Sequence, residues 1–456
     1  MGIRRIYAKL LAVVVALTLV ASACGGAATE EAPPATTPAE TETTDDPVTD
    51  AGPDTTDETE AEETAQPAAV DDSELAGASE EENQAALVAE IEAVFTDWQQ
   101  SNGIPGASLS VRLPDREPIA IAAGVTDLAT GEAVTTDDFF RIGSITKPMT
   151  AALVLQLIDE GLIELDEPVD TYIPGWLAGH EFGSEITVRQ LMDHTNGLIE
   201  YAFDPSFYAQ VSDRLDQPLE SDELFDFLAS REPLFEPGTA YSYETGGFFT
   251  LGDVIEVVTG NSAAEEMRRR IFEPAGAENI YLAPQESPPE PTVTGYGRSA
   301  LYVAFTALIG IEDTEGLTID TATTDAEPVI GTLSTPQEFL QSAGWTGGGA
   351  EAQLESVSAV FKALFDGTIL SDEQIAEMTT TVFDADYGLG ISVDDFDGEQ
   401  IFSHGGGVPG FRSDANYIPA LDISYAVSAN LIPLPDGADV GELRDELIPI
   451  LVDATG

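Results

Sequence analysis

Ser144 and Lys147 stand three residues apart in the segment Arg141-Ile-Gly-Ser-Ile-Thr-Lys, which opens a run with helical spacing. Residues three apart in the first turn of a helix project from the same face, so the lysine amine can approach the serine hydroxyl. An amine whose pKa is lowered by burial can accept the hydroxyl proton, and the N–H groups at a helix start favour the developing negative charge. The pair predicts a nucleophilic serine.

The alternative interpretation of this pair is a helix-capping serine followed by a surface lysine, which occurs by chance in many helices. The composition of the chain favours the chemical interpretation. Beyond residue 24 the chain holds only two lysines, Lys147 and Lys362. Lysine is rare in this chain, and one of these two lysines lies three residues from Ser144.

Tyr243 lies in a second segment of interest, Pro237-Gly-Thr-Ala-Tyr-Ser-Tyr-Glu-Thr-Gly-Gly. An ordinary tyrosine has a pKa of about 10 and is mostly protonated at neutral pH. It serves as a general base or proton relay when its hydroxyl is held near a cation. Taken alone, Tyr243 is better explained as a packed aromatic side chain before a helix.

A glycine run forms the third segment, Phe402-Ser-His404-Gly405-Gly406-Gly407-Val-Pro-Gly-Phe. Glycines beside a strand let a substrate or another backbone approach closely, and their N–H groups can donate to an oxyanion. The alternatives are a bulge or tight bend for the glycines and a structural role for His404. The segment predicts a strand that lines a site.

Composition excludes several classes of function. The 456 residues include 83 Asp and Glu against 17 Lys and Arg, a formal net charge of -66, which would repel a phosphate backbone. Nucleic acid is therefore not an expected partner. One cysteine and three histidines leave no cluster for zinc or an iron–sulfur centre. We expect no metal and no organic cofactor.

The first 24 residues are typical of a secretory signal, with Arg4, Arg5 and Lys9 before an apolar run that is too short for a comfortable membrane span. The only cysteine, Cys24, follows small residues, and the stretch resembles a bacterial lipobox in which this thiol is acylated. We expect an exported protein held at the outer face of the cell membrane by lipid on Cys24. The alternative is ordinary signal cleavage and secretion.

Residues 25–84 hold 19 acidic residues and no Lys or Arg, and they are expected to be a disordered acidic linker. Residues 85–456 are expected to be the folded domain. This part is acidic too, with 64 Asp and Glu against 14 Lys and Arg. Such a surface suits a salty environment, in which screening weakens self-repulsion, so we interpret the charge as a salt adaptation.

The order of expected elements predicts one α+β domain. Residues 85–100 have helical periodicity, and the chain closes with a helix over 440–452. Strands are expected near both ends, at 107–113, 119–123, 388–393, 400–403, 412–418 and 423–430. Helices are expected between them, at 147–160, 187–193, 221–230, 247–259, 262–271 and 351–366. The stretch 284–337 is expected to be a long irregular loop.

In order and spacing, the three segments resemble the serine β-lactamase and penicillin-binding protein superfamily. The branch is the one with class C β-lactamases, D-alanyl-D-alanine carboxypeptidases and related serine esterases. The resemblance covers nearly all of residues 85–456. Further similar segments are Gln156–Asp170, Ile186–Leu198, Glu236–Thr239, Arg270–Pro274 and Tyr387–Gly390. The resemblance implies an antiparallel sheet flanked by helices, with an inserted helical lobe.

The resemblance also implies roles. Ser144 would attack a carbonyl, Lys147 would help to deprotonate it, and Tyr243 would pass the proton to the leaving group. The backbone N–H groups of Ser144 and Gly407 would form the oxyanion hole. His404-Gly405-Gly406 stands where the family has K-T-G or H-x-G, and a histidine there is more similar to the carboxypeptidases and esterases than to class C β-lactamases.

One position departs from the family pattern. The second motif of the family is Y-x-N, and here Thr245 replaces the asparagine, whose amide both donates and accepts. This places β-lactam turnover in doubt, and Glu244 would repel carboxylate-bearing substrates unless it points away. Arg412 could offset that charge by binding a substrate carboxylate. Its alternative is an arginine paired with surface acids.

The sequence therefore predicts an exported serine hydrolase that forms an acyl-enzyme on Ser144. Its expected substrate is a small molecule or peptide with an amide or ester bond, such as a D-alanyl peptide or a small ester. One alternative is a true β-lactamase. The other is a non-catalytic envelope protein that keeps the fold to bind peptidoglycan fragments or another protein, which the change to Thr245 favours.

Overall fold

A computed structural model describes residues 80–202, 204–211, 217–297, 329–330, 337–396, 398–432 and 440–455. The expected signal and Cys24, most of the expected linker, and much of the expected 284–337 loop lie outside these residues. Within the described ranges, no helix combines the length and the apolar character needed to cross a membrane.

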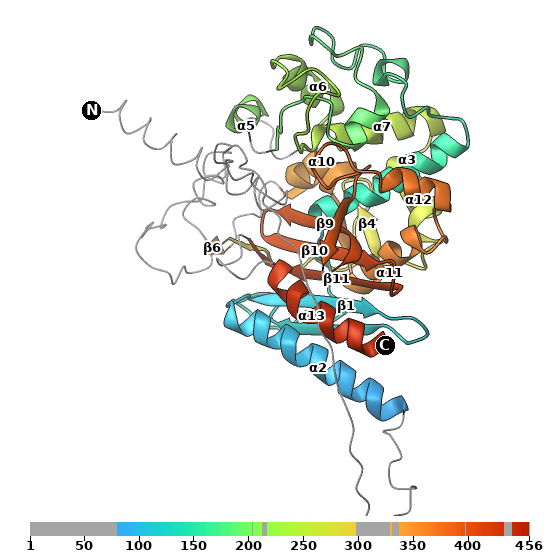
Figure 1. The fold of residues 1–456 in the computed structure, drawn as a ribbon. Coiled ribbons are helices and arrows are strands. Elements are labelled where there is room, and N and C mark those ends of the chain that lie inside the picture. Colours follow the sequence, from blue (N-terminus) through green and yellow to red (C-terminus); the bar gives the residue numbers. More distant parts are fainter. Residues whose placement is uncertain are drawn as a thin grey trace, which may run out of the picture. The chain divides into compact units, whose positions relative to one another are not determined.

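The main sheet has six strands and joins the two ends of the domain (Figure 1). Its strand order is β2-β1-β11-β10-β9-β8, and every neighbouring pair is antiparallel. The pairing of β1 with β11 sets Ala107 opposite Ala429, so strands from the two ends of the domain share one sheet. The strands are β1 (Gly106–Arg112), β2 (Ile119–Gly124), β8 (Ser392–Phe396), β9 (Glu399–Val408), β10 (Phe411–Ile418) and β11 (Ile423–Ala429).

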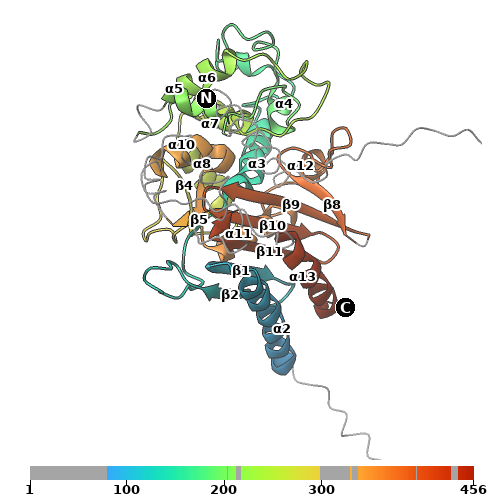
Figure 2. The same cartoon turned by 90° about the vertical axis from the view of Figure 1, so that its left-hand side faces the viewer.

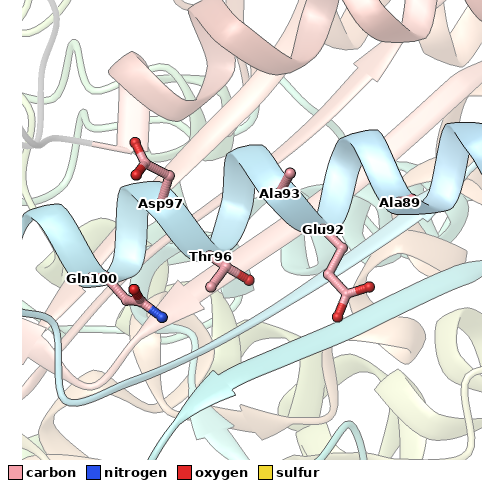
Figure 3. A pocket seen from close by; sticks show the side chains of 6 residues that line it. All are labelled: Ala89, Glu92, Ala93, Thr96, Asp97 and Gln100. Atoms are coloured by element: carbon pink, nitrogen blue, oxygen red, sulfur yellow. The ribbon is translucent and has the colours of Figure 1, made fainter.

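Two terminal helices cover one face of this sheet, α2 (Glu80–Ser101) and α13 (Val440–Thr455) (Figures 1 and 2). Apolar side chains of α2 at helical spacing pack against alternate side chains of β1 and β11, since one stripe of a helix fits one face of a pleated sheet. The shared core includes Ile91, Phe95, Leu109, Tyr425, Val427, Leu443 and Leu447. The opposite side of α2 carries a shallow hollow of about 400 Å³ lined by Ala89, Glu92, Ala93, Thr96, Asp97 and Gln100 (Figure 3).

The other face of the sheet packs on a larger core that extends into the helical lobe. Helix α3 (Thr146–Asp159) runs through this core, with its residues from Thr146 to Leu155 all buried, and α11 (Leu354–Phe365) packs near β1 and β11. The other helices of this part are α4 (Val188–Met192), α5 (Pro205–Val211), α6 (Ser221–Ala229), α7 (Gly246–Thr259), α8 (Ala263–Met267), α10 (Gln337–Gly348) and α12 (Asp372–Met378).

Two small sheets were not predicted. In one, β3 (Phe140–Arg141) and β4 (Ile280–Leu282) both pair with β7 (Ala350–Ala352). In the other, β5 (Tyr296–Gly297) pairs with β6 (Val329–Ile330) and β12 (Leu431–Ile432). Runs of two or three residues are too short to show a period in the sequence. The first sheet matters most, because β3 leads directly into Ser144.

Several expected boundaries were wrong. The strand expected at 388–393 begins only at Ser392, because Gly390 has φ +73° and its N–H donates to the Met192 carbonyl, so the chain turns there. Conversely, β9 continues through the glycine run to Val408. The helix expected at 262–271 is α8 followed by a π-helical turn, η3 (Arg268–Phe272).

Candidate active site

Ser144 lies in a 3-10 turn, η1 (Gly143–Ile145), between β3 and the first residue of α3. Gly143 has φ +54°, a conformation that glycine adopts without strain, and this turn brings the next side chain toward the lysine on α3. Nζ of Lys147 lies 3.1 Å from Oγ of Ser144. The lysine is fully buried, whereas Ser144 is partly exposed, so the hydroxyl faces solvent with the amine behind it.

Lys147 is held from a second side by a group that the sequence did not reveal. Its amine donates to the carbonyl oxygen of Gly347 at 2.7 Å. This carbonyl belongs to α10, where Trp345 has φ 31° and ψ -125° and interrupts the helical path. The amine also lies 4.9 Å from the ring centroid of Tyr243 and 5.6 Å from that of Phe248, positions in which an aromatic face attracts a cation. The feature of the sequence that could have indicated this segment is the run of glycines at 347–349.

The glycine run of β9 abuts the turn that carries Ser144. A Cβ atom at Gly406 would lie 1.9 Å from the Ile142 carbonyl oxygen, and one at Gly143 would lie 3.0 Å from the Gly407 nitrogen. Only a strand without side chains can approach so closely. The structure thus brings the Gly407 backbone beside the Ser144 turn, which is where an oxyanion hole would require it.

Tyr243 stands in a cluster of buried rings. Its ring centroid lies 4.4 Å from that of His194 and 6.2 Å from those of His404 and Tyr387. The phenol ring therefore borders Lys147 and both histidines. The structure brings Ser144, Lys147 and Tyr243 together from segments that are about 100 residues apart in the sequence.

The two residues after Tyr243 point in different directions. The Glu244 carboxylate turns into the interior, where it accepts hydrogen bonds from the Asn196 amide at 2.9 Å and from the Gly247 N–H at 2.7 Å. Glu244 is fully buried, so it does not face a substrate as a repelling charge. The Thr245 hydroxyl donates to Oε2 of Glu200 at 2.8 Å. Glu200, which the sequence analysis did not single out, thus joins Thr245 where the family has asparagine.

Both glutamates have raised pKa values. Burial is the main cause for Glu244 and raises its pKa to about 7. Burial and the neighbouring Glu244 raise the pKa of Glu200 to about 7 as well, although Lys147 and the Thr245 hydrogen bond act in the opposite direction. Near neutral pH, a positive group that arrived beside Glu200 would favour its ionised form.

His404 lies on β9 with its imidazole buried. Nε2 lies 2.9 Å from the Tyr387 hydroxyl, and Nδ1 lies 2.7 Å from the Gly405 carbonyl oxygen. Burial, assisted by Lys147, lowers the pKa of His404 to about 3, so the ring is neutral. Because both ring nitrogens contact protein groups, His404 lines the site through its ring face and backbone.

Arg412 is opposite Gly407 in the pairing of β10 with β9. Its guanidinium lies along the glycine strand, since a Cβ at Gly405 would be 2.9 Å from Nη1, and Nη1 donates to the Gly406 carbonyl at 3.3 Å. The side chain is mostly buried, so it is not a surface arginine. It supplies positive charge behind the strand that carries Gly407. Among the described residues, no group of His, Cys, Asp and Glu side chains is arranged to hold a metal ion.

Residues 87–447 match the sequence model of the beta-lactamase family, and the chain belongs to this family. The segment that matches includes every site residue described above.

Similar proteins are of several kinds. Penicillin-binding protein 4 of Amycolatopsis lactamdurans is 34% identical over 195 residues, 42% of this chain and 49% of that protein. Esterase EstB of Burkholderia gladioli is 31% identical over 199 residues, 42% of this chain and 50% of that protein. The chain thus spans about half the length of these curated relatives.

A solved structure extends the likeness over the whole fold. The D-stereospecific amidohydrolase from a Streptomyces species is similar with a TM-score of 0.63 and 28% identity, over 79% of this chain and 97% of that one. The expected α+β fold with an antiparallel sheet, flanking helices and a helical lobe is confirmed.

Proposed function

We propose that this protein is a serine hydrolase that cleaves an amide or ester through an acyl-enzyme on Ser144. The observation that carries the proposal is the 3.1 Å contact between Oγ of Ser144 and the buried amine of Lys147, beside the Gly407 backbone. Burial disfavours the charged form of an amine, so a buried lysine is a better proton acceptor than one in water. The penicillin-binding protein, the esterase and the amidohydrolase that this chain resembles support the same class of reaction.

The proposed reaction begins when neutral Lys147 accepts the Ser144 proton and Oγ attacks the substrate carbonyl carbon. The carbonyl oxygen becomes an oxyanion and accepts hydrogen bonds from the backbone N–H groups of Ser144 and Gly407. Tyr243, beside the Lys147 amine, passes a proton to the leaving nitrogen or oxygen as the bond to carbon breaks. Water then attacks the ester carbon and gives a proton to the same groups. They return it to Oγ of Ser144 as the ester bond breaks and the acid leaves.

For the substrate, we favour a D-alanyl peptide or a small ester over a β-lactam. The Thr245 hydroxyl donates to Glu200, so a carboxyl group lies beside the position where the family has asparagine. A carboxylate at that place suits a substrate whose acyl part carries an ammonium group, such as a D-aminoacyl amide with an unblocked amine. The amidohydrolase that resembles this chain is D-stereospecific by name, which supports the D configuration.

The reaction class is tested by intact mass after mixing with benzylpenicillin, for wild type and Ser144→Ala. A penicillin-sized adduct on wild type alone would support the nucleophile and indicate slow deacylation. Rapid consumption of benzylpenicillin without adduct would instead identify a β-lactamase. If wild type neither hydrolyses amides, esters and β-lactams nor forms an adduct, but still binds peptidoglycan fragments, the non-catalytic alternative is correct.

The substrate preference is tested with D-alanine p-nitroanilide and its N-acetyl form. Wild type is expected to prefer the unblocked amine, and Glu200→Gln is expected to lose that preference, mainly through KM. Glu286→Gln removes a carboxylate that binds Arg268 and serves as a matched control. Equal rates for the two substrates would exclude ammonium recognition by Glu200 without affecting the proposed serine chemistry.

We further propose that the protein is exported and held at the membrane by acylation of Cys24. The charged start, the apolar run and the position of the single cysteine support this. Labelling of growing cells with a fatty-acid probe should mark wild type and leave Cys24→Ser unmarked. Release of unmarked wild type into the medium would favour the alternative of secretion.

A further inference from the structure

Tyr387 connects two buried histidines that come from different parts of the fold. Its hydroxyl lies 2.9 Å from Nε2 of His404 on β9 and 3.3 Å from Nε2 of His194, in the loop after α4. All three side chains are nearly or completely buried, so water does not replace these contacts readily. One hydroxyl therefore links the glycine strand to the helical lobe.

In both histidines, Nδ1 is the ring nitrogen that does not contact Tyr387. The partner of each Nδ1 determines which nitrogen of that ring carries the proton. The Gly405 carbonyl oxygen can only accept, so Nδ1 of His404 carries a proton at the 2.7 Å contact. His404 is neutral, so its Nε2 is the acceptor for the Tyr387 O–H. The Tyr387 hydroxyl has donated its only proton to His404, so its oxygen must accept a hydrogen bond from His194. Nε2 of His194 therefore carries the proton of that ring.

The far side of His194 agrees with this assignment. The backbone N–H of Glu244 can only donate, and it lies 3.4 Å from Nδ1 of His194, which must then be unprotonated. A carboxyl oxygen of Glu244 lies 3.6 Å from the same nitrogen, beyond hydrogen-bond distance, and burial raises the pKa of this carboxyl group to about 7, so below pH 7 it is mainly neutral. If Nδ1 of His194 carried the proton instead, the Nε2 atoms of both histidines would be acceptors. The single hydrogen of the Tyr387 hydroxyl could then satisfy only one of them, and one buried group would lose its partner.

The chain of contacts lies along one side of Tyr243. The ring of Tyr243 lies 4.4 Å from His194 and 6.2 Å from both Tyr387 and His404, measured between centroids. These three side chains form one wall of its pocket, and Lys147 lies 4.9 Å from the same ring. A shift of that wall would change the position of the Tyr243 hydroxyl relative to Ser144.

We propose that Tyr387 is a positioning residue, which holds His194 and His404 in opposite tautomers and thereby fixes the ring of Tyr243 for proton transfer. The hydrogen bonds run in one direction, from the Glu244 N–H through His194, Tyr387 and His404 to the Gly405 carbonyl. The kinetic part of this proposal rests on the proposed function. The tautomers do not depend on it.

The tautomers are measured by long-range ¹H–¹⁵N spectra of the full chain labelled with ¹⁵N-histidine. The chain has only three histidines, and His180→Asn identifies the third. We expect a protonated Nδ1 in His404 and a protonated Nε2 in His194, both unchanged in Ser144→Ala. In Tyr387→Phe, His194 loses its acceptor and should show mixed tautomers. The same tautomer for both histidines in wild type would overturn the proposal.

The kinetic consequence is measured on the same variants. Tyr387→Phe should lower kcat about 10- to 100-fold with little change in KM, because a small misplacement of a proton donor has effects of this size. Tyr417→Phe is the control. Tyr417 lies on β10, five residues beyond Arg412, and its hydroxyl donates to Asp422. An unchanged kcat in Tyr387→Phe would overturn the positioning role. Opposite tautomers in a wild type without hydrolysis would overturn only the proposed function.

Discussion

The amine of Lys147 lies 2.7 Å from the carbonyl oxygen of Gly347, 200 residues further along the chain. This contact and the 3.1 Å contact to Ser144 fix the buried amine between the Ser144 hydroxyl and the interrupted helix α10. A flexible lysine would reach the serine only part of the time. Because it is held on two sides, the amine is in position before a substrate binds. Such positioning accounts for much of the effect of a catalytic base.

Replacement of this lysine should abolish most of the activity. Lys147→Met keeps a long apolar stem but has no proton acceptor, so kcat/KM should fall about 10²- to 10⁴-fold. The melting temperature should fall much less, since methionine keeps the packing of the buried stem. Lys362→Met is the matched control, because Lys362 pairs with Asp366 and Asp422 away from the site. Equal losses in the two variants would contradict the assigned role.

The close approach of β9 to Ile142 predicts that Gly406 cannot be replaced. Gly406→Ala would place a methyl group 1.9 Å from the Ile142 carbonyl oxygen and force the two segments apart. We expect a loss of about 1–3 kcal/mol in the free energy of unfolding and a loss of acylation, measured by denaturant titration and adduct formation.

Gly441→Ala provides the comparison for this variant. Nothing lies within 4 Å of a Cβ at Gly441 in α13, so that substitution should stabilise the protein by about 0.5–1 kcal/mol. A Gly406→Ala protein with wild-type stability and acylation would show that the strand can move without cost.

The buried Glu244 predicts a specific pH dependence of stability. Its pKa rises from 4.5 to about 7 on folding, so its contribution is fully present below pH 4.5 and is lost as pH rises through 7. The shift corresponds to about 3 kcal/mol. The lowered pKa values of His194 and His404 have the opposite slope, because their contribution is lost as pH falls below about 6.5.

Comparison with a variant separates these opposing effects. Between pH 5 and pH 8, the melting temperature of Glu244→Gln should rise relative to that of wild type at each step. Glu442→Gln, on an exposed position of α13, should follow wild type. Parallel curves for wild type and Glu244→Gln would disprove a buried, protonated carboxyl group at this position.

The acidic surface predicts stabilisation by salt. With 64 Asp and Glu against 14 Lys and Arg in residues 85–456, repulsion between like charges should weaken as the Debye length shrinks. The melting temperature should rise between low salt and about 1 M sodium chloride. An uncharged osmolyte at equal osmolality should have a smaller effect, and a melting temperature that does not rise with salt would exclude the adaptation.

Much of the fold was predictable from the sequence because local patterns carry the information. The periodicity of 147–160 and 247–259 predicted α3 and α7 almost to the residue, and runs of residues that favour strands predicted β1, β2, β10 and β11. The strand expected at 388–393 was wrong, because the positive φ of Gly390 depends on its contact with Met192 in another segment.

By itself, the sequence determined which residues are the candidates for chemistry. The three-residue spacing places Lys147 beside Ser144 on any helix, and the glycine run allows close approach wherever the strand lies. Only the tertiary structure decided what surrounds them. It turned Glu244 inward, set Glu200 beside Thr245 and brought Gly347 to Lys147. These contacts join segments from 45 to 200 residues apart, and no local pattern encodes them, because they depend on how the helices pack on the sheet.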